Sequence, residues 1–338
     1  MNNCYQYYNN QCVQSYPFSI NELNIYGDGS AGNLIISMTS NWITDPPPNN
    51  NFMFMNFTIN DGIILTVASG TIIRVKQNFT NNGFIIVQPP LLGESVINPS
   101  GPEGTISPVY NQIVVAANSL MTPYQYQNNK VAKVYGGTAY PKAILINLLN
   151  PGILGGGNGA VGAYQTSSIT AFGNTQAGGG GGTLSIYVKC TFINNGNISA
   201  NGGKVPITSY GGNGGGAGGI IIIASKQNIV NNGSINANGS DGSTGIITFS
   251  QPNPHSGGGG GGGLIHILSP NANTLMNINV NGDNPGTSVG SDAGDYGGGG
   301  GAMGGDGGNG GFGKFAATAG SSGVVVFTTT SSPEYMLI

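Results

Sequence analysis

One unit is written three times in this sequence: GGGGGTLSIYVKCTFINNGNISANG at residues 178–202, GGIIIIASKQNIVNNGSINANG at 218–239 and GGGGGGGLIHILSPNANTLMNINVNG at 257–282. Each copy contains a glycine run, an aliphatic strand and a short strand that closes on Asn-Gly. The closing glycines fall at 202, 239 and 282, so the period is 37 and then 43 residues. A fixed period in this range indicates a solenoid, in which no unit buries its apolar face alone.

The same register extends into the N-terminal part of the chain. Three segments align without gaps: IIRVKQNFTNNGFI at 72–85, SIYVKCTFINNGNI at 185–198 and IIASKQNIVNNGSI at 222–235. In each segment one lysine lies seven residues before a glycine, and these lysines are Lys76, Lys189 and Lys226. Because basic residues are rare in the chain, we expect the three lysines to occupy equivalent positions on successive strands and to face the same side.

The composition predicts an all-β chain. Glycine supplies 62 of the 338 residues, hydrophobic residues make up 38% and charged residues only 6%. Glycine in a helix costs about 1 kcal/mol relative to alanine, so long helices are not expected. Disordered chains combine low hydrophobicity with high net charge, whereas the net charge here is −3. We therefore expect an ordered protein of β-solenoid or β-sandwich-like repeats.

The chain divides into three expected parts. Residues 1–20 are polar and tyrosine-rich, and we interpret them as an N-terminal arm. Residues 21–150 are expected to form an N-terminal β domain that is interrupted by a loop insertion at 89–140. Residues 151–338 form the glycine-rich β-repeat domain. The segment 142–149 is interpreted as a strand that returns from the insertion.

The glycine runs leave two alternatives open. A run is either a flexible linker or a polyproline-II-type helix, with three residues per turn and outward-pointing backbone groups that bond to neighbouring helices. Linkers need not recur beside a buried strand in every repeat, so we favour packed glycine helices. The Asn-Gly pairs fit type I′ hairpin turns, because both residues tolerate positive φ. The glycines assigned to turns are Gly83, Gly196, Gly202, Gly233, Gly239 and Gly282.

Residues that support catalysis or metal binding are scarce. Neither His255 nor His266 has a cysteine or a second histidine at metal-ligand spacing, which argues against zinc. His266 lies in the strand sequence LIHIL, where alternation predicts that a polar residue faces solvent. Calcium-binding β-roll repeats are rich in acidic residues, but Asp292, Asp295 and Asp306 do not recur in this way. We therefore expect no metal, no cofactor and no enzymatic activity.

Cysteine content and charge restrict the function further. Three cysteines cannot form a closed disulfide framework; Cys4 and Cys12 are close enough to pair, and the alternative is three free thiols. The nine basic residues are spread too widely to predict a patch, so no nucleic-acid binding is expected. No apolar run of about 18 residues predicts a membrane helix. The N-terminus lacks the basic and apolar regions of a Sec signal peptide.

The block DGIILTVASGTIIRVKQNFTNNGFIIV at residues 61–87 resembles a pattern that recurs in phage fibre and adhesin proteins. In that pattern, strands of the I-x-V type and a closing T-N-N-G-x-I lead into glycine-rich repeats, which the repeats quoted above also resemble. The resemblance covers about residues 52–88 and 150–330. It implies a protein of the virion surface, such as a fibre tip or a capsid decoration, that acts by structure and attachment.

We therefore expect a structural or attachment protein of a virus particle, assembled in the host cytoplasm, whose partners are its own copies and other virion proteins. The first alternative is an adhesin that binds a receptor or glycan through loop residues Tyr210, His255 and Tyr296. An ice-binding protein requires a regular threonine-rich face, which is missing. A polysaccharide-degrading enzyme requires paired carboxylates on its strands, and the close acidic pairs here lie in a glycine loop.

Overall fold

The computed structural model describes residues 24–88, 135–151, 155–160, 177–203, 211–245, 255–272, 277–287 and 297–337 with their side chains, except Gly313. It also describes Gly162, Val205 and the backbone of several short strands. These short strands pair antiparallel: β1 (Tyr7–Tyr8) with β2 (Gln11–Cys12), β11 (Glu94–Val96) with β12 (Ile106–Pro108), β13 (Tyr126–Gln127) with β14 (Lys130–Val131), and β15 (Ala163–Gln165) with β16 (Thr170–Phe172) and β25 (Asp295–Tyr296).

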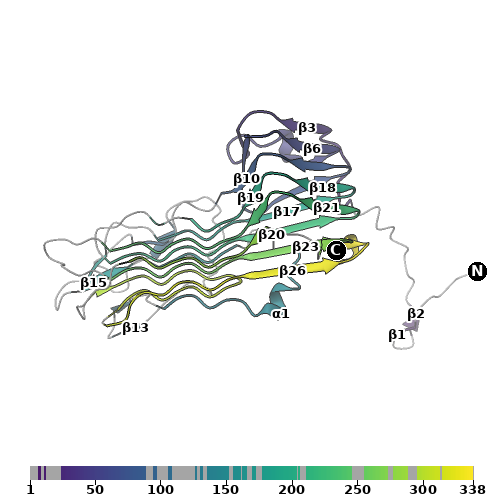
Figure 1. Ribbon diagram of the computed structural model, residues 1–338. Coiled ribbons are helices and arrows are strands. Elements are labelled where there is room, and N and C mark those ends of the chain that lie inside the picture. The colour runs from purple at the N-terminus through teal and green to yellow at the C-terminus, as the bar shows by residue number, and fades with distance from the viewer. Residues whose placement is uncertain are drawn as a thin grey trace, which may run out of the picture.

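Most strands lie in three parallel sheets, which the chain visits in rotation (Figure 1). Sheet 1 contains β3 (Asn33–Ile36), β6 (Asn56–Ile59), β9 (Phe79–Asn81), β18 (Thr191–Asn194) and β21 (Asn228–Asn231). Sheet 2 contains β4 (Ser40–Asn41), β7 (Ile64–Val67), β10 (Phe84–Val87), β19 (Asn197–Ser199), β22 (Ser234–Asn236) and β24 (Ile278–Asn279). Sheet 3 contains β5 (Met53–Phe54), β8 (Thr71–Val75), β17 (Thr183–Val188), β20 (Ile220–Ser225), β23 (Leu264–Ser269) and β26 (Val324–Thr329).

The strand pairing confirms the register that the sequence predicts. In sheet 3, Ser185 pairs with Ile72 on one side and with Ile222 on the other. In sheet 2, Ile198 lies in the same way between Ile85 and Ile235. The gapless alignment of the three segments is therefore also their alignment in space. The register is the same before and after the long stretch that separates β10 from β17.

The described residues contain almost no helix, as the composition predicts. They include the short α1 (Lys142–Leu145) and the 3-10 helices η2 (Pro48–Asn50) and η5 (Pro333–Met336). The expected returning strand at 142–149 is wrong, because this segment begins with α1. Lysine, alanine and leucine are good helix formers, and Pro141 precedes the first helical residue. None of the helices in the described ranges is long and apolar enough to span a membrane.

Two apolar clusters hold the sheets together. The first joins side chains of all three sheets, including a stack of Phe57, Phe79 and Phe192 with ring centroids 5.1 and 4.9 Å apart and almost parallel planes. The second covers the other face of sheet 3 and includes Leu145 and Met303. The central strands of sheet 3, β17, β20 and β23, are therefore buried on both faces, which explains why they have continuous apolar runs instead of alternation.

In the later part of the chain, the glycine runs form the connections from strands of sheet 2 to strands of sheet 3. Together these connections extend away from the strands (Figure 1). We call this region the glycine layer. Three tracts leave the strands of sheet 2, at 200–203, 237–245 and 280–287. Four tracts return to the strands of sheet 3, at 177–182, 211–219, 255–263 and 316–323. Residues 137–140, 155–160 and 297–311 also contribute backbone hydrogen bonds to the layer.

Hydrogen bonds in the glycine layer repeat every three residues. In the run 257–263, the amides of residues 257, 260 and 263 donate to the carbonyl oxygens of residues 243, 240 and 237. The amides of residues 258 and 261 donate to residues 298 and 301, and those of residues 259 and 262 donate to residues 318 and 321. Successive residues of one run therefore bond to three different neighbouring tracts.

Lack of space, and not backbone strain, excludes other residues from the glycine layer. Among the described residues, the glycines with positive φ all precede β9 in the chain, and none lies in the layer. A Cβ atom on Gly260 would lie 2.0 Å from the carbonyl oxygen of Gly216, and one on Gly180 would lie 1.7 Å from that of Gly156. Both distances are shorter than any Cβ contact allows, so the tracts approach as closely as glycine alone permits.

The Asn-Gly pairs are not hairpin turns, which corrects the prediction of type I′ geometry. The strands beside Gly196, β18 and β19, belong to different sheets, and neither residue of its Asn-Gly pair has positive φ. A Cβ atom on Gly196 would lie 1.9 Å from the carbonyl oxygen of Gly83, and one on Gly233 would lie 1.8 Å from that of Gly196. These glycines are needed because the bends stack directly on one another. The other three assigned glycines, Gly202, Gly239 and Gly282, lie in the glycine layer.

Candidate functional site

The far edge of the glycine layer gathers several connecting segments. The amide of Gly212 donates to the carbonyl oxygen of His255 at 2.7 Å, and the amide of Gly298 donates to that of Gly212 at 2.8 Å. The described residues that flank the segments 163–176, 246–254 and 288–296 therefore lie near this edge. In backbone pairing, Tyr296 of β25 lies beside Ala163 of β15. Figure 1 places β15 at the end of the layer farthest from the three sheets.

The three expected receptor-contact residues fare differently. His255 is fully buried, so the prediction that its side chain contacts a receptor is wrong for this structure. The reason is local packing, because the imidazole lies against Gly311, where a Cβ atom would be 2.9 Å from Nδ1. Tyr296 lies at the far edge by its backbone, and its side chain is outside the described residues. Tyr210 also lies outside them, directly before Gly211 of a returning tract.

His266 is a second correction. Its side chain is fully buried instead of facing solvent, because apolar groups cover both faces of sheet 3. The imidazole Nε2 and the Thr328 hydroxyl form a hydrogen bond of 2.8 Å between β23 and β26. Burial lowers the pKa of His266 to about 4. The imidazole is therefore neutral at pH 7, where it serves as a packed part of the sheet.

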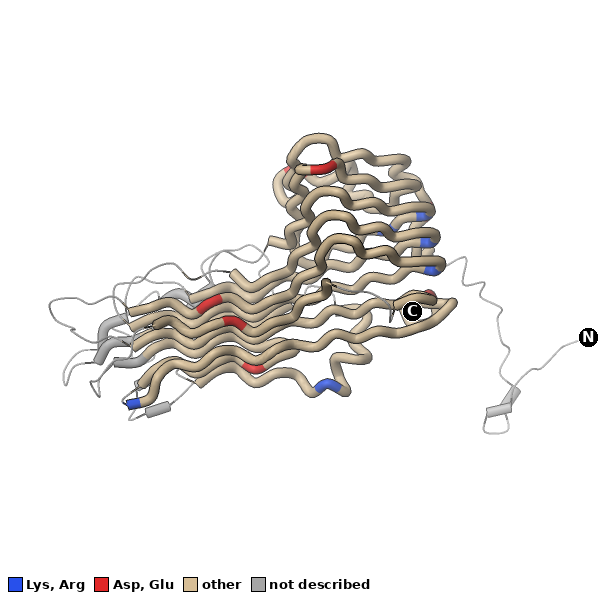
Figure 2. Tube along the Cα trace, in the orientation of Figure 1, with Lys and Arg blue, Asp and Glu red and all other residues tan. Residues whose placement is uncertain are grey.

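A second candidate site, which is concave, lies where the strands of sheet 3 end. Lys76, Lys189 and Lys226 directly follow β8, β17 and β20, and the amide of Lys189 donates to the carbonyl oxygen of Val75 at 2.9 Å. Figure 2 shows basic positions one above another on neighbouring strands at this end. The prediction that the three lysines are equivalent is confirmed. The prediction of no basic patch is wrong here, because stacking brings together lysines that are far apart in sequence.

These lysines line a pocket of about 280 Å³, which we call the lysine groove. One wall is the segment at the start of the described chain, and another is the 3-10 helix η5 near its end. The lining residues are Asn24, Ile25, Tyr26, Gly27, Asp28, Lys76, Lys189, Lys226 and Glu334. The groove therefore combines three ammonium groups with two carboxylates, one phenol and a short apolar surface.

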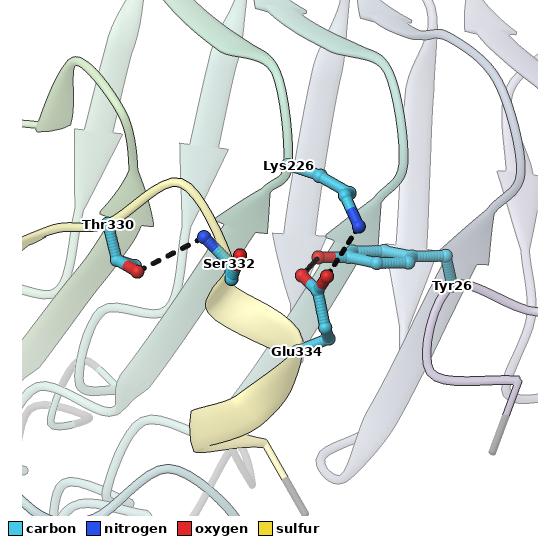
Figure 3. A network of polar contacts seen from close by, with 5 residues as sticks. All are labelled: Tyr26, Lys226, Thr330, Ser332 and Glu334. Atoms are coloured by element: carbon cyan, nitrogen blue, oxygen red, sulfur yellow. Dashed lines mark hydrogen bonds and ion pairs between the residues drawn. The ribbon is translucent and has the colours of Figure 1, made fainter. Parts of the chain in front are cut away.

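Glu334 is the charged group of the lysine groove with the most side-chain partners (Figure 3). Its Oε1 accepts a hydrogen bond from Lys226 Nζ at 2.5 Å, and its Oε2 accepts one from the Tyr26 hydroxyl at 2.9 Å. The Glu334 side chain is only 6% exposed. Burial by itself raises the pKa of Glu334, but the bonds from Lys226 and Tyr26 outweigh it and leave the pKa lowered. Burial, together with the Glu334 carboxylate, raises the pKa of Tyr26.

The remaining cations of the groove are less fully used. Lys76 Nζ donates to the backbone carbonyl oxygen of Asp28 at 3.3 Å. The exposed side chain of Lys189 makes no hydrogen bond or ion pair with any residue that the structure describes. Arg74 lies on β8, two residues before Lys76. It donates to the Ile25 carbonyl oxygen and lies over the Tyr187 ring, 5.3 Å from the ring centroid. The middle rung of the lysine stack is therefore the unpaired one.

Sequence reasoning found the lysines of this site but missed Tyr26 and Glu334. Both come from ends of the described chain, 308 residues apart, and no periodic pattern links them. The available signal was a single carboxylate in the segment SSPEYMLI, directly after the last strand. An acidic residue that follows a strand of a lysine-bearing sheet is a natural partner for one of those lysines.

Metal and thiol predictions fall partly outside the described residues. In the ranges described, no group of three or more His, Cys, Asp or Glu side chains lies close enough to hold a metal. Asp292 lies outside these ranges and Asp295 is described by backbone alone, whereas Asp306 Oδ1 accepts the amide of Ala139 at 2.7 Å. Cys190 is a free thiol. The proposed pairing of Cys4 with Cys12 concerns side chains outside the described residues.

Comparison with known proteins returns no relative: no family model matches this chain, and neither a curated protein nor a solved structure does. The features of this chain that bear on its function are therefore the glycine layer, its far edge and the lysine groove.

Proposed function

We propose that this chain is a structural and attachment protein of a virus particle, such as a fibre, a spike or a capsid-decorating component, and that it acts by assembly instead of catalysis. In this proposal the three sheets form a β-solenoid, and the glycine layer is a slab of packed polyproline-II-type helices. The slab extends from the solenoid and holds the connecting segments at its far edge.

The observation that carries this proposal is the three-residue repeat of hydrogen bonds in the run 257–263. A polyproline-II helix has three residues per turn and no internal hydrogen bonds, so its backbone groups must bond to neighbours. The bonds to three neighbouring tracts supply those partners, and the closeness of Gly260 to Gly216 fits a contact that only glycine makes. A flexible linker needs neither feature.

Such a slab is suited to attachment because it is stiff without a large hydrophobic core. Each of its tracts is tied to several others through backbone bonds, so the far edge is held at a fixed distance from the sheets. Charged residues make up only 6% of the chain, and surfaces near neutrality associate readily. Among the described strands, β26 is also an edge strand of sheet 3, and an edge strand presents backbone groups that a strand from another copy can pair with.

The alternative proposal is a receptor- or glycan-binding adhesin, on a cell surface or at a tail tip. The residues that flank the segments 163–176, 246–254 and 288–296 lie together at one edge, which favours this alternative. Binding residues are disproportionately found on loops that a rigid scaffold positions. In this version the far edge makes the contact, with Tyr210 and Tyr296 as its candidate aromatic residues.

Mass spectrometry of density-purified particles from the source of the gene tests the structural role. We expect peptides of this chain in the particle fraction, and their restriction to the soluble cell extract would refute a virion role. Attachment is tested separately, by replacing residues 246–254 with a Gly-Ser segment of equal length and measuring binding to host cells. We expect binding to be lost at an unchanged melting temperature, whereas unchanged binding would point to a scaffold without receptor contact at this segment.

A further inference from the structure

We propose that the lysine groove is a binding site for a carboxylate-bearing ligand of about monosaccharide size, with Lys189 and Lys76 as its cations. This site lies at the end of the sheets, away from the far edge of the glycine layer, and it does not depend on the proposed virion role.

The groove already contains a bound carboxylate, which shows how a ligand would be held. The Glu334 carboxylate takes an ammonium hydrogen on one oxygen and a phenol hydrogen on the other. It is almost fully buried, so the groove compensates the loss of water around a carboxylate. Hydrogen bonds with an ionised partner on both sides are among the strongest in proteins. The internal contact therefore serves as a template for an external one.

The stacked geometry repeats that template. Strands of a sheet lie about 4.8 Å apart, so Lys189 stands one strand spacing from Lys226 and one from Lys76. Lys226 is used by Glu334, while Lys189 makes no ion pair within the described chain and Lys76 donates only to the backbone carbonyl oxygen of Asp28, whose carboxylate attracts it without a hydrogen bond. Two neighbouring ammonium groups are thus left to take the two oxygens of one carboxylate.

Charge and size support the same ligand class. The groove has three lysines against Asp28 and Glu334, so it keeps an excess positive charge in a chain whose net charge is −3. Its volume of about 280 Å³ is at the lower end of small-molecule pockets, which fits a single ring better than an extended chain. The side chains of Ile25 and Asn24 add an apolar surface and a hydrogen-bonding amide for the rest of the ligand.

Isothermal titration of the full chain with D-glucuronate tests the proposal, with D-glucose as the uncharged probe and sulfate as the non-carboxylate anion. We expect saturable binding of glucuronate only. Lys189→Gln is expected to weaken it about tenfold, the effect of losing one charge-assisted hydrogen bond. Lys142→Gln is the matched control, because Lys142 is exposed on α1 outside the groove, and its affinity should equal that of the native chain.

Glu334→Gln provides an independent arm. It removes the internal carboxylate and frees Lys226, so glucuronate should bind several-fold more tightly; melting curves would establish that this variant is folded. The absence of saturable glucuronate binding to the native chain would overturn the proposal. Equal binding of sulfate would refute a carboxylate site, and an unchanged affinity in Lys189→Gln would refute the assignment of that lysine. If Glu334→Gln fails to fold, the comparison of Lys189→Gln with Lys142→Gln still decides.

Discussion

The three sheets and the glycine layer solve the same problem in opposite ways. In both, parallel passages of the chain are joined by backbone hydrogen bonds. In the sheets, side chains decide which passages meet, as in the stack of Phe57, Phe79 and Phe192. In the layer, the absence of side chains does so, because the tracts approach to distances that no Cβ atom permits. One chain can therefore be ordered by side chains that fill a core or by backbones that pack closely because they carry no side chains.

This difference predicts that the two regions fail under opposite substitutions. Phe79→Ala removes the middle ring of the phenylalanine stack, whose side chain is fully buried. We expect it to lower the free energy of unfolding by about 4 kcal/mol, a typical cost when a buried phenylalanine is replaced by alanine and leaves a cavity. Chemical denaturation of the native chain and the variant measures the change. Phe84→Ala on β10 is the control, because Phe84 is 44% exposed and should cost far less. Equal losses would show that the stack is not the source of the stability.

Gly260→Val tests the glycine layer in the opposite direction, by adding atoms. The new Cβ atom would lie 2.0 Å from the Gly216 carbonyl oxygen, so the tract must move away from its neighbours. We expect a loss of about 3 kcal/mol, the upper part of the range for overpacking. Ser322→Val in the outermost returning tract is exposed and should change the free energy by less than about 0.5 kcal/mol. A native melting temperature for Gly260→Val would return the glycine tracts to the status of linkers.

Local patterns in the sequence predict the strands well but predict contacts between distant segments poorly. The lysine register works because each circuit through the sheets repeats the same spacing, so stacking follows from alignment. The predicted strand at 142–149 and the predicted exposure of His266 are both wrong, but for different reasons. The first overlooked a local signal, the helix formers that follow Pro141. The burial of His266 depends on residues far away in the chain that cover the outer face of sheet 3, such as Tyr26 and Met303.

The Asn-Gly pairs fail for a different reason. In most proteins this pair indicates a hairpin because both residues accept positive φ. Here the glycine is required by the bend stacked beneath it, and the asparagine side chain bonds to its equivalent in the next circuit. The sequence pattern is the same in both cases. Only the repetition of the pair at a fixed period, together with parallel sheets, indicates that it belongs to a stack.

His266 lies in sheet 3 on the face that the second apolar cluster covers, and it provides a pH test of that burial. Its pKa is lowered from 6.5 to about 4 in the folded state, so between these values the unfolded chain binds more protons. Stability is therefore full above pH 6.5 and falls as the pH drops toward 4. We expect His266 to contribute a loss of about 2 kcal/mol between pH 7 and pH 5.

The measurement for His266 is the difference in pH dependence between the native chain and His266→Gln, which cannot titrate but keeps a polar group near Thr328. Because all other titrating groups are shared, the difference isolates this residue. If the free energy of unfolding falls equally in the native chain and in His266→Gln between pH 7 and pH 5, the imidazole is not buried in solution.

The smallest expected effect separates two asparagine ladders, one buried and one exposed. Asn194 is buried, accepts from Asn81 Nδ2 at 2.8 Å and donates to Asn231 Oδ1 at 2.7 Å. The next residue, Asn195, makes the same kind of bonds to Asn82 and Asn232, but it is exposed. Asn194→Ala leaves buried amide groups without partners and should cost about 1.5 kcal/mol.

Asn195→Ala is the matched control for Asn194→Ala, because water replaces the lost partner and the expected cost is below about 0.5 kcal/mol. Denaturation midpoints of the two variants, measured side by side, give the comparison. A larger loss for Asn194→Ala means that the side-chain ladders stabilise the sheets only where water is excluded. The backbone bonds of the inner glycine tracts, such as the run 257–263, meet that condition because those residues are buried. Equal losses of stability in the two variants would mean that burial does not decide how much a ladder contributes. Both ladders would then act by aligning successive repeats of the chain.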